Sequence, residues 1–338
     1  MVMSINPIKF GTDGWRGVIA ADFTFERVMR VAPLSAQVLA AAYGATVSQP
    51  RLVVVGYDRR FMAAEFARVA ADSLLVAGFD VLLATGYAPT PAFSWAAKAQ
   101  GALGAIVMTA SHNPAKYLGL KIKGAFGGSV SKDITKQVEA RLGGPIPAAT
   151  VPGTLTEFNP WESYCQGLQA KVDVTPIREA IAAGKLAVFA DVMHGAAASG
   201  LQRLLGIEIG EINGDRDPLF GGNPPEPLPK YTPELFKAIK ADAQEHPDRL
   251  RVGLVFDGDS DRIAAVDGAG NFLSSQILIP VLIDHLVTNK GKTGEVVKTL
   301  SGSDLIPRIA ESYGLPLFET PVGYKYIADR MLSAGNVL

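Results

Sequence analysis

Short apolar runs alternate with longer amphipathic stretches along most of the chain. Apolar runs rich in β-branched residues are typical of buried strands, and apolar positions three or four residues apart indicate helices. The predicted strands cover residues 51–56, 79–84, 104–108, 117–124, 186–191, 251–256, 295–300 and 315–319. The predicted helices cover residues 24–42, 61–77, 92–100, 160–170, 175–183, 232–244, 275–288 and 304–313, with one more ending near 205 and a last one after 325. This alternation predicts α/β units with mixed, largely parallel sheets.

The helix expected at 24–42 carries both a start signal and an interruption. Thr24 is a suitable N-cap residue, and Glu26 places an acidic side chain in the first turn. Pro33 has no backbone N–H to donate and its ring clashes with the preceding turn. We therefore expect this helix to be kinked or split at Pro33.

Segments rich in turn formers divide the chain. Residues 143–153 contain three glycines and three prolines and predict a loop or linker, and residues 215–229 are too dense in Pro and Gly for a helix or interior strand. We expect three consecutive α/β domains at 1–172, 173–273 and 274–338. The third is expected to be incomplete.

Composition narrows the class of protein. The 338 residues are 48% hydrophobic and 19% charged, and a net charge of -1 argues against a nucleic-acid binder. Cys165 is the single cysteine, so an intramolecular disulfide is excluded. The first seven residues lack the pattern of a leader peptide, and no apolar stretch is long enough to cross a bilayer. We expect a cytoplasmic protein with a small-molecule partner.

A serine follows the apolar run 104–108, in the polar turn 109–114 that ends in a proline. Open α/β sheets place their ligands at the carboxyl ends of strands, so Ser111 is expected at a ligand-binding edge. The chain contains no P-loop, and Ser111 is not in a Gly-x-Ser-x-Gly elbow. A nucleotidase or an esterase is correspondingly disfavoured.

Three carboxylates crowd the end of the predicted strand 251–256. They belong to Asp257, Asp259 and Asp261, and they would repel one another unless a cation offset them. All-oxygen ligands favour Mg²⁺ or Ca²⁺. An EF-hand is rejected because its sixth and twelfth positions would hold Arg262 and Gly268. The alternative is an exposed acidic turn without a metal.

Two basic residues have both an ordinary and a functional interpretation. Arg16 lies among three glycines at 10–17, where it is either a solvated turn residue or a bidentate phosphate ligand. Lys121 follows Ser111 by ten residues on the predicted strand 117–124, where it is either a solvated side chain or an acid or base. Position alone leaves both alternatives open.

Four motifs together resemble those of the α-D-phosphohexomutases. They occupy residues 10–17, 109–114, 257–262 and 320–325, in the family's order and over almost the whole chain. Within the superfamily the chain is most similar to a phosphoglucomutase or phosphomannomutase. Trp15 and the Thr-Pro-Val-Gly-Tyr-Lys stretch favour these glucose-type enzymes over a phosphoglucosamine mutase.

The resemblance implies specific roles for the motif residues. Ser111 would be the phosphoserine, Lys121 the general acid/base, and Arg16 and Arg262 the organisers of the phosphoryl group, while His112 and Asn113 complete the serine loop. Asp257, Asp259 and Asp261 would bind Mg²⁺, with the serine phosphate as a further ligand. Thr320, Gly323 and Lys325 match a loop that contacts substrate.

The implied activity is that of an isomerase, an intramolecular phosphotransferase. Phospho-Ser111 would donate its phosphoryl group to glucose 1-phosphate, and the resulting glucose 1,6-bisphosphate would turn around and return its other phosphate, leaving glucose 6-phosphate. Mannose phosphates are further expected substrates.

The chain also departs from the family. Leu118 stands where members usually carry Asn, and the chain ends before the family's sugar-selecting loop and fourth, phosphate-binding domain. One hypothesis is therefore a mutase weakened in substrate capture or completed by a C-terminal chain as partner. The other is a noncatalytic fragment that binds sugar phosphate or metal.

Overall fold

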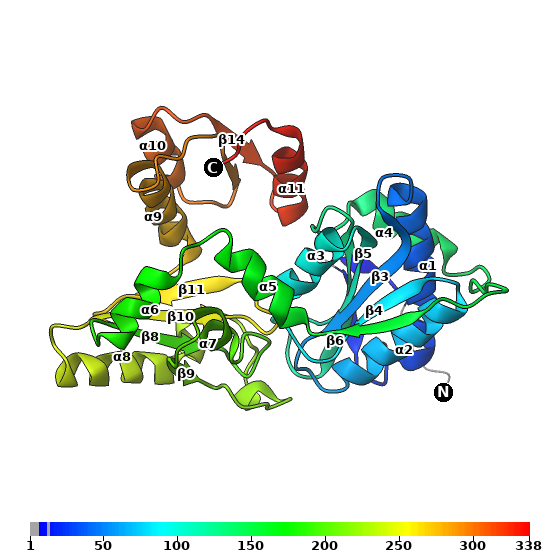
Figure 1. The fold of residues 1–338 in the computed structure, drawn as a ribbon, viewed down its shortest axis with the longest axis horizontal. Helices are drawn as coiled ribbons and strands as arrows, with labels where there is room; N and C mark the ends of the chain where they lie inside the picture. Colours follow the sequence, from blue (N-terminus) through cyan, green and yellow to red (C-terminus); the bar gives the residue numbers. More distant parts are fainter. Residues whose placement is uncertain (1–6, 12–13) are drawn as a thin grey trace.

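The structure is a computed structural model, and it describes residues 7–11 and 14–338. Thr12 and Asp13 of the motif at 10–17 lie outside the described residues, as do the first six residues, on which most of the argument about a leader peptide depends. The described chain forms three groups of helices and strands, called here the first, second and third units (Figure 1).

The first unit is built, within the described residues, on a seven-stranded sheet of order β1-β2-β6-β5-β3-β4-β7. Its strands are β1 (Phe10–Gly11), β2 (Gly14–Val18), β3 (Gln49–Tyr57), β4 (Asp80–Ala84), β5 (Ala102–Met108), β6 (Tyr117–Gly124) and β7 (Leu155–Phe158). The strands β5, β3, β4 and β7 are parallel, while β6, β2 and β1 pair antiparallel at the other side. The sheet is therefore mixed.

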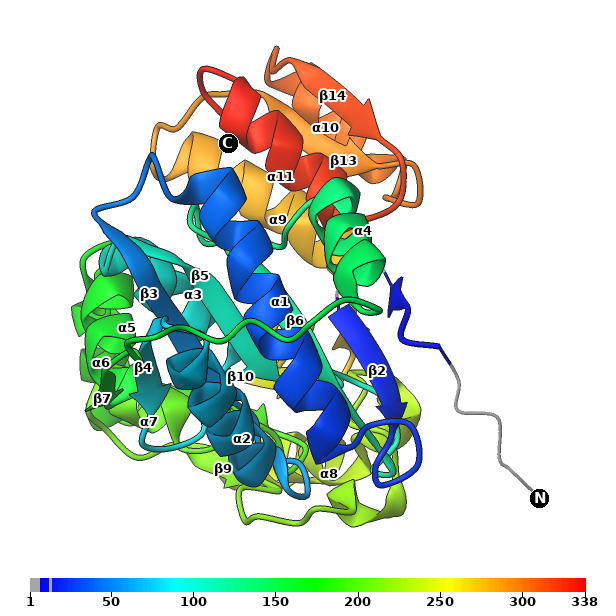
Figure 2. The same ribbon diagram turned by 90° about the vertical axis from the view of Figure 1, so that its right-hand side faces the viewer.

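Helices cover both faces of this sheet. They are α1 (Phe25–Tyr43), α2 (Ala63–Val76), α3 (Thr90–Ala99), α4 (Lys132–Arg141) and α5 (Pro160–Gln169). The apolar side chains of α1, α2 and α4 form one core with alternate residues of the strands, and those of α3 and α5 form a second core on the opposite face. Figure 2 shows α1 and α2 lying across the first of these faces.

The second unit holds, among the described residues, a five-stranded sheet of order β12-β11-β10-β8-β9. Its elements are α6 (Thr175–Ala182), β8 (Leu186–Asp191), α7 (Gly200–Leu205), β9 (Gly210–Ile212), α8 (Pro233–Glu245), β10 (Leu250–Phe256), β11 (Ile263–Val266) and β12 (Phe272–Leu273). The strands β9, β8 and β10 are parallel, and β10 turns back into antiparallel β11. That reversal carries the acidic loop of residues 257–262.

The third unit contains α9 (Ser275–Thr288), β13 (Val296–Thr299), α10 (Leu305–Ser312), β14 (Leu317–Thr320) and α11 (Tyr324–Ser333). The two strands are parallel, and a small core forms where α9 and α10 pack on β13. The predicted boundaries at 172 and 273 fall in the connections between the three units; as domain boundaries they stay predictions. No described helix combines the length and apolarity that a membrane crossing requires.

Most predicted elements are confirmed, and the exceptions have physical reasons. The described part of the chain contains a helix α4 and short strands, among them β2 and β11, that the pattern did not predict. Of the two outcomes expected at Pro33, the split is wrong, because α1 is continuous from Phe25 to Tyr43, and the kink stays a prediction. The buried apolar face of α1 stabilises the helix on both sides of Pro33. Pro33 cannot donate a hydrogen bond to the Met29 carbonyl, but Met29 is exposed to solvent.

Phe93 offers a test of the second core. Its ring is fully buried, and it lies so close over Gly56 that a methyl group there would overlap it. We expect Phe93→Ala to lower the free energy of unfolding by about 3–5 kcal/mol, measured by urea denaturation, because it removes a large buried ring and leaves a cavity. Phe61→Ala is the control, since Phe61 is 52% exposed. Equal effects of the two substitutions would contradict this description of the core.

Candidate active site

Ser111 lies in the loop that joins the central strand β5 to β6. Its side chain is fully buried, and its φ of 54° puts it in the left-handed region, which is uncommon for a residue with a β-carbon. The Thr109 hydroxyl accepts a hydrogen bond of 2.9 Å from the Ser111 amide. This conformation turns the serine hydroxyl toward the second unit.

The serine hydroxyl meets the acidic loop of the second unit. Ser111 Oγ donates to Asp257 Oδ2 at 2.8 Å and lies 3.3 Å from His112 Nδ1. Gly258 packs directly against the serine, since a β-carbon on Gly258 would lie 2.4 Å from the Ser111 carbonyl oxygen. Two residues 146 positions apart in sequence thus face each other across the junction of two units.

The acidic loop is shaped by its own backbone. Asp257 Oδ1 accepts from the amides of Asp261 and Arg262 at 3.0 and 3.1 Å, which curls the loop around that carboxylate. The carboxylates of Asp257, Asp259 and Asp261 present oxygens that all lie within 4.8 Å of one another. Burial, with the neighbouring charges of Asp259 and Asp261, raises the pKa of Asp257 well above its usual range.

Asp259 is held by the first unit. Its backbone carbonyl accepts from the amide of Thr90 at 2.9 Å, and its Oδ2 accepts from the Thr90 hydroxyl at 2.5 Å and from Lys121 Nζ at 2.8 Å. Thr90 begins α3, so the positive end of that helix also faces this carboxylate. Burial acts to raise the pKa of Asp259, but Lys121 and Thr90 outweigh it and lower the pKa below its usual value.

The arrangement of the three carboxylates is suited to binding a divalent cation. Asp259 Oδ1 is buried and has no hydrogen-bond partner within the described residues. A buried carboxylate oxygen without a partner is costly, and a cation ligated by the three carboxylates would satisfy it. Oxygen ligands at this spacing suit Mg²⁺.

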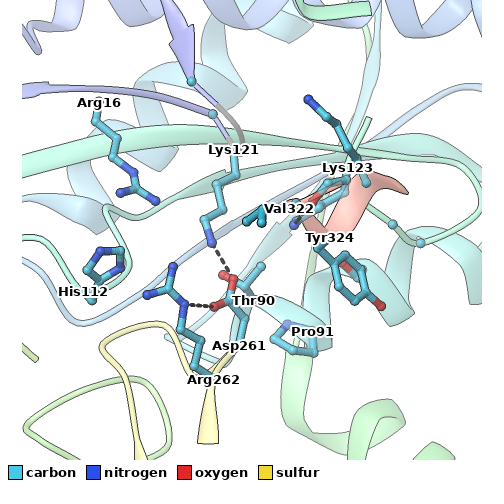
Figure 3. A pocket seen from close by; sticks show the side chains of 18 of the residues that line it. Arg16, Thr90, Pro91, His112, Lys121, Lys123, Asp261, Arg262, Val322 and Tyr324 are labelled. Carbon is cyan, nitrogen blue, oxygen red and sulfur yellow. Dashed lines mark hydrogen bonds and ion pairs between the residues drawn. The ribbon is translucent and has the colours of Figure 1, made fainter. Parts of the chain in front are cut away.

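A cavity of about 920 Å³ opens at His112, the residue after Ser111, and extends to the third unit (Figure 3). Ser111 itself is buried and is not part of the described lining. Cations from the first, second and third units line it, whereas Asp261 is its acidic lining residue among the described positions. The basic lining residues are Lys9, Arg16, Lys121, Lys123, Arg262 and Lys325. A cavity with this excess of positive charge favours an anionic ligand.

Lys121 crosses the cavity wall to reach the acidic loop. It stands on β6 opposite Val107 of β5, it is 1% exposed, and its ammonium lies 2.6 Å from Asp261 Oδ2. Figure 3 shows Lys121 pointing toward Asp261, with Arg16 and His112 to one side. Lys121 is therefore buried at the site and is not a solvated strand residue.

Arg16 and His112 flank the serine loop. Arg16 Nη1 donates to Asn113 Oδ1 at 2.5 Å, so the glycine-rich strand β2 contacts this loop through its arginine. His112 lies on the cavity wall, where burial and then the charges of Arg262 and Arg16 lower its pKa. Arg262 is half-exposed and lies 3.9 Å from Asp261.

The third unit contributes the start of α11 to the cavity but does not bring every predicted residue there. Gly323 and Lys325 line the cavity. Thr320 is buried at the end of β14, where its hydroxyl donates to the backbone oxygens of Lys298 and Pro321, and it is not part of the lining. Figure 2 shows α11 beside α4 of the first unit.

Several residues of the site were missed by the sequence analysis. Thr90 holds the acidic loop, and Arg60 hydrogen-bonds three carbonyls of the serine loop and that of Tyr117 at the start of β6. One signal was available for Arg60, because residues 58–60 come just after the predicted strand 51–56 and therefore lie at the ligand edge. Nothing in the sequence pattern marks Thr90.

The chain is similar in sequence to known proteins over all three units. Residues 7–144, 162–270 and 274–338 match the family models described as phosphoglucomutase/phosphomannomutase, alpha/beta/alpha domains I, II and III. A phosphoglucosamine mutase of Acidothermus cellulolyticus is 31% identical, over 99% of this chain and 71% of its own length. A phosphoglucomutase/phosphomannomutase of Thermococcus kodakarensis is 30% identical, over 97% of this chain and 70% of its own length.

The fold is also similar to that of solved structures. A crystal structure from Thermus thermophilus, provisionally named a phosphomannomutase, superposes with a TM-score of 0.85 at 34% sequence identity. The match covers 99% of this chain and 74% of that one.

Gly258 tests the contact between the two loops. We expect Gly258→Ala to destabilise the protein by about 1–3 kcal/mol, because the new methyl group would overlap the Ser111 carbonyl and force the loops apart. The shift in thermal unfolding midpoint measures this. Gly86→Ala is the matched control, since a β-carbon there meets open space. Similar midpoints for the two variants would contradict the close packing.

Proposed function

The chain belongs to the phosphoglucomutase/phosphomannomutase family, and on that premise we propose that it transfers a phosphoryl group between Ser111 and the 1- and 6-positions of a hexose phosphate. One observation carries the proposal: the Ser111 hydroxyl is hydrogen-bonded to Asp257, next to a cavity whose described lining includes six basic residues. This arrangement supports a serine that exchanges phosphate with an anionic substrate.

Phosphoryl transfer requires positioning and neutralisation of charge more than covalent chemistry by the protein. Arg16 and Arg262 line the cavity near the serine loop and have the planar fork that binds phosphate oxygens in pairs. We assign them the binding of the transferred phosphoryl group. His112, 3.3 Å from the serine hydroxyl, is assigned to the same end of the cavity.

Asp257, Asp259 and Asp261 would hold Mg²⁺, with Ser111 as a further ligand through its phosphate. When bound, the ion would neutralise charge that develops on the transferring phosphoryl oxygens. The close approach of the carboxylate oxygens and the unpartnered Asp259 Oδ1 support this assignment.

Lys121 is proposed as the general acid/base. In one half-reaction the sugar hydroxyl attacks the phosphorus of phospho-Ser111, the bond from Ser111 Oγ to phosphorus breaks, and Lys121 takes the hydroxyl proton. In the other half-reaction the serine oxygen attacks the second phosphate of the 1,6-bisphosphate, and Lys121 returns the proton to the departing sugar oxygen. The proton is taken by the neutral amine and returned by the ammonium, and burial beside Asp259 and Asp261 keeps Lys121 Nζ directed at the site.

The substrate is proposed to be glucose 1-phosphate, converted to glucose 6-phosphate through glucose 1,6-bisphosphate, with mannose phosphates as further substrates. Gly323 and Lys325, which line the cavity, are proposed to contact the sugar phosphate. Thr320 is proposed to stabilise their loop through its hydrogen bond to the Pro321 carbonyl. Glucosamine phosphates are a second candidate, because relatives of similar identity are named phosphoglucosamine mutases. A noncatalytic fragment that binds sugar phosphate is the competing interpretation.

Intact-mass spectrometry tests the central step. The chain is incubated with Mg²⁺ and glucose 1,6-bisphosphate, and we expect it to gain one phosphate, located on Ser111 by peptide mapping. Ser111→Ala is expected to gain none, because it removes the accepting oxygen. Glucosamine 1,6-bisphosphate in a parallel reaction shows which sugar is preferred.

A coupled assay of glucose 1-phosphate conversion completes this test. Wild type is expected to exceed the Ser111→Ala background when Mg²⁺ and a trace of the bisphosphate are present. Equal rates, together with no phosphate gain by wild type, would favour the noncatalytic interpretation.

Metal binding is tested separately. We expect Asp259→Asn to weaken Mg²⁺ binding by about tenfold or more in isothermal titration calorimetry, because it removes one of three carboxylate charges from the site. Asp267→Asn is the control: Asp267 is an acidic turn residue whose oxygens accept from its own loop, at Ala269 and Asn271. Unchanged affinity in Asp259→Asn would rule out this metal site.

A further inference from the structure

A buried turn lies beneath the serine loop and belongs to none of the four motifs. It consists of Asp58, Arg59 and Arg60, directly after β3, and the Asp58 amide donates to the carbonyl of Met108 at the end of β5. Asp58 and Arg60 are 2% and 1% exposed. A guanidinium so completely removed from water must be compensated by close hydrogen bonds.

Arg60 donates its hydrogen bonds to the serine loop and to the first residue of β6. Its Nη2 donates to the carbonyls of Ser111 and Asn113, both at 2.6 Å, and its Nη1 donates to the carbonyls of Pro114 and Tyr117 at 3.2 and 3.1 Å. Four carbonyl oxygens thus converge on one planar group. Without a cation between them, these oxygens would repel one another and the loop would open.

The Ser111 carbonyl is fixed from two sides. Arg60 Nη2 binds it from the first unit, and Gly258 of the acidic loop packs on it from the second unit. Ser111 needs this restraint, because the left-handed conformation is unfavourable for a residue with a β-carbon. The same conformation aims the serine hydroxyl at Asp257.

Other contacts set the plane of the guanidinium. Asp58 Oδ2 lies 3.4 Å from Arg60 Nε in an ion pair between two fully buried side chains. From the second unit, the ring of Phe220 lies against the guanidinium at 4.8 Å, and Arg216 donates to the Arg60 carbonyl at 3.4 Å. Arg60 therefore contacts the serine loop and the second unit at once.

We propose that Arg60 is a positioning residue for phosphoryl transfer, which holds Ser111 in the conformation that aims its hydroxyl at Asp257. The inference rests on the proposed function. Geometry, and not charge alone, is the operative property, because a lysine ammonium is a single point donor and cannot span four carbonyls in one plane. Asp58 orients Arg60 from its other side.

The test compares Arg60→Lys with Arg59→Lys. Arg59 is the matched control: it is the neighbouring buried arginine and also reaches the second unit, at the Gly214 carbonyl, but it makes no described hydrogen bond to the serine loop. Single-turnover phosphorylation of Ser111 by glucose 1,6-bisphosphate is followed by mass spectrometry over a range of bisphosphate concentrations. We expect Arg60→Lys to lower the maximal rate about 100-fold, the typical effect of an ångström-scale misplacement.

The half-saturating concentration should stay within about threefold of wild type, since Arg60 does not line the cavity. Arg59→Lys should retain the wild-type rate within about threefold. Equal rates in the two variants would overturn the proposal. If Arg60→Lys does not fold, Asp58→Asn replaces it, with an expected loss of about tenfold and the same unchanged half-saturation.

A second measurement separates this inference from the proposed function. Hydrogen–deuterium exchange at the amides of residues 109–117 requires no phosphorylation, and it should be faster in Arg60→Lys than in wild type or Arg59→Lys. Unchanged exchange would overturn the positioning role even in an active enzyme. Failure of wild type to accept phosphate would instead overturn the proposed function, while the exchange result would still decide how the serine loop is held.

Discussion

Negative charge concentrated at one sheet edge is the constraint on which the rest of this structure depends. The carboxylate oxygens of Asp257, Asp259 and Asp261 lie within 4.8 Å of one another, beside the hydroxyl proposed to carry a phosphoryl group. Such charges repel strongly where water is excluded. The fold opposes them with Lys121 from β6 and with the amide end of α3 at Thr90. Arg16 and Arg262 add positive charge at the cavity wall, and a divalent cation among the carboxylates would complete the balance.

The order of helices and strands followed from the sequence because burial and pattern agree. Strand β5 is apolar and buried along its whole length, and such a run has no other stable place in a globular chain. Helix α4 was missed because Ile134 and Val138 are its only buried residues and, apart from the exposed Ala140, the rest of it is polar. Strand β2 was missed because its glycines indicate a turn, whereas its pairing with β6 is long-range. The continuity of α1 through Pro33 likewise depends on packing that no local rule contains.

The site residues likewise divide into those that the sequence pattern places and those whose position depends on long-range packing. Ser111 and the acidic loop follow predicted strands, so the rule that ligands bind at strand ends brought them to one edge, and Lys121 was a candidate because its predicted strand follows the Ser111 turn directly. Thr90 could not be found in this way, because it begins a helix and its partner Asp259 lies 169 positions away in sequence. For Arg60 the rule gives the sheet edge but not the partners, since the carbonyl of Ser111 that it binds lies 51 positions away. The same limit applies to Thr320: its motif gives its place in the chain, while its burial away from the cavity depends on how β14 packs.

A chase experiment tests the central claim most directly. The chain is labelled on Ser111 with radioactive phosphate, freed of small molecules, and mixed with unlabelled glucose 1-phosphate and Mg²⁺. If Ser111 is a phosphoryl carrier opposite a metal-binding loop, the label leaves the protein and appears in a sugar bisphosphate. If the label stays on the protein, or is released as inorganic phosphate at the same rate with and without the sugar, the account is contradicted.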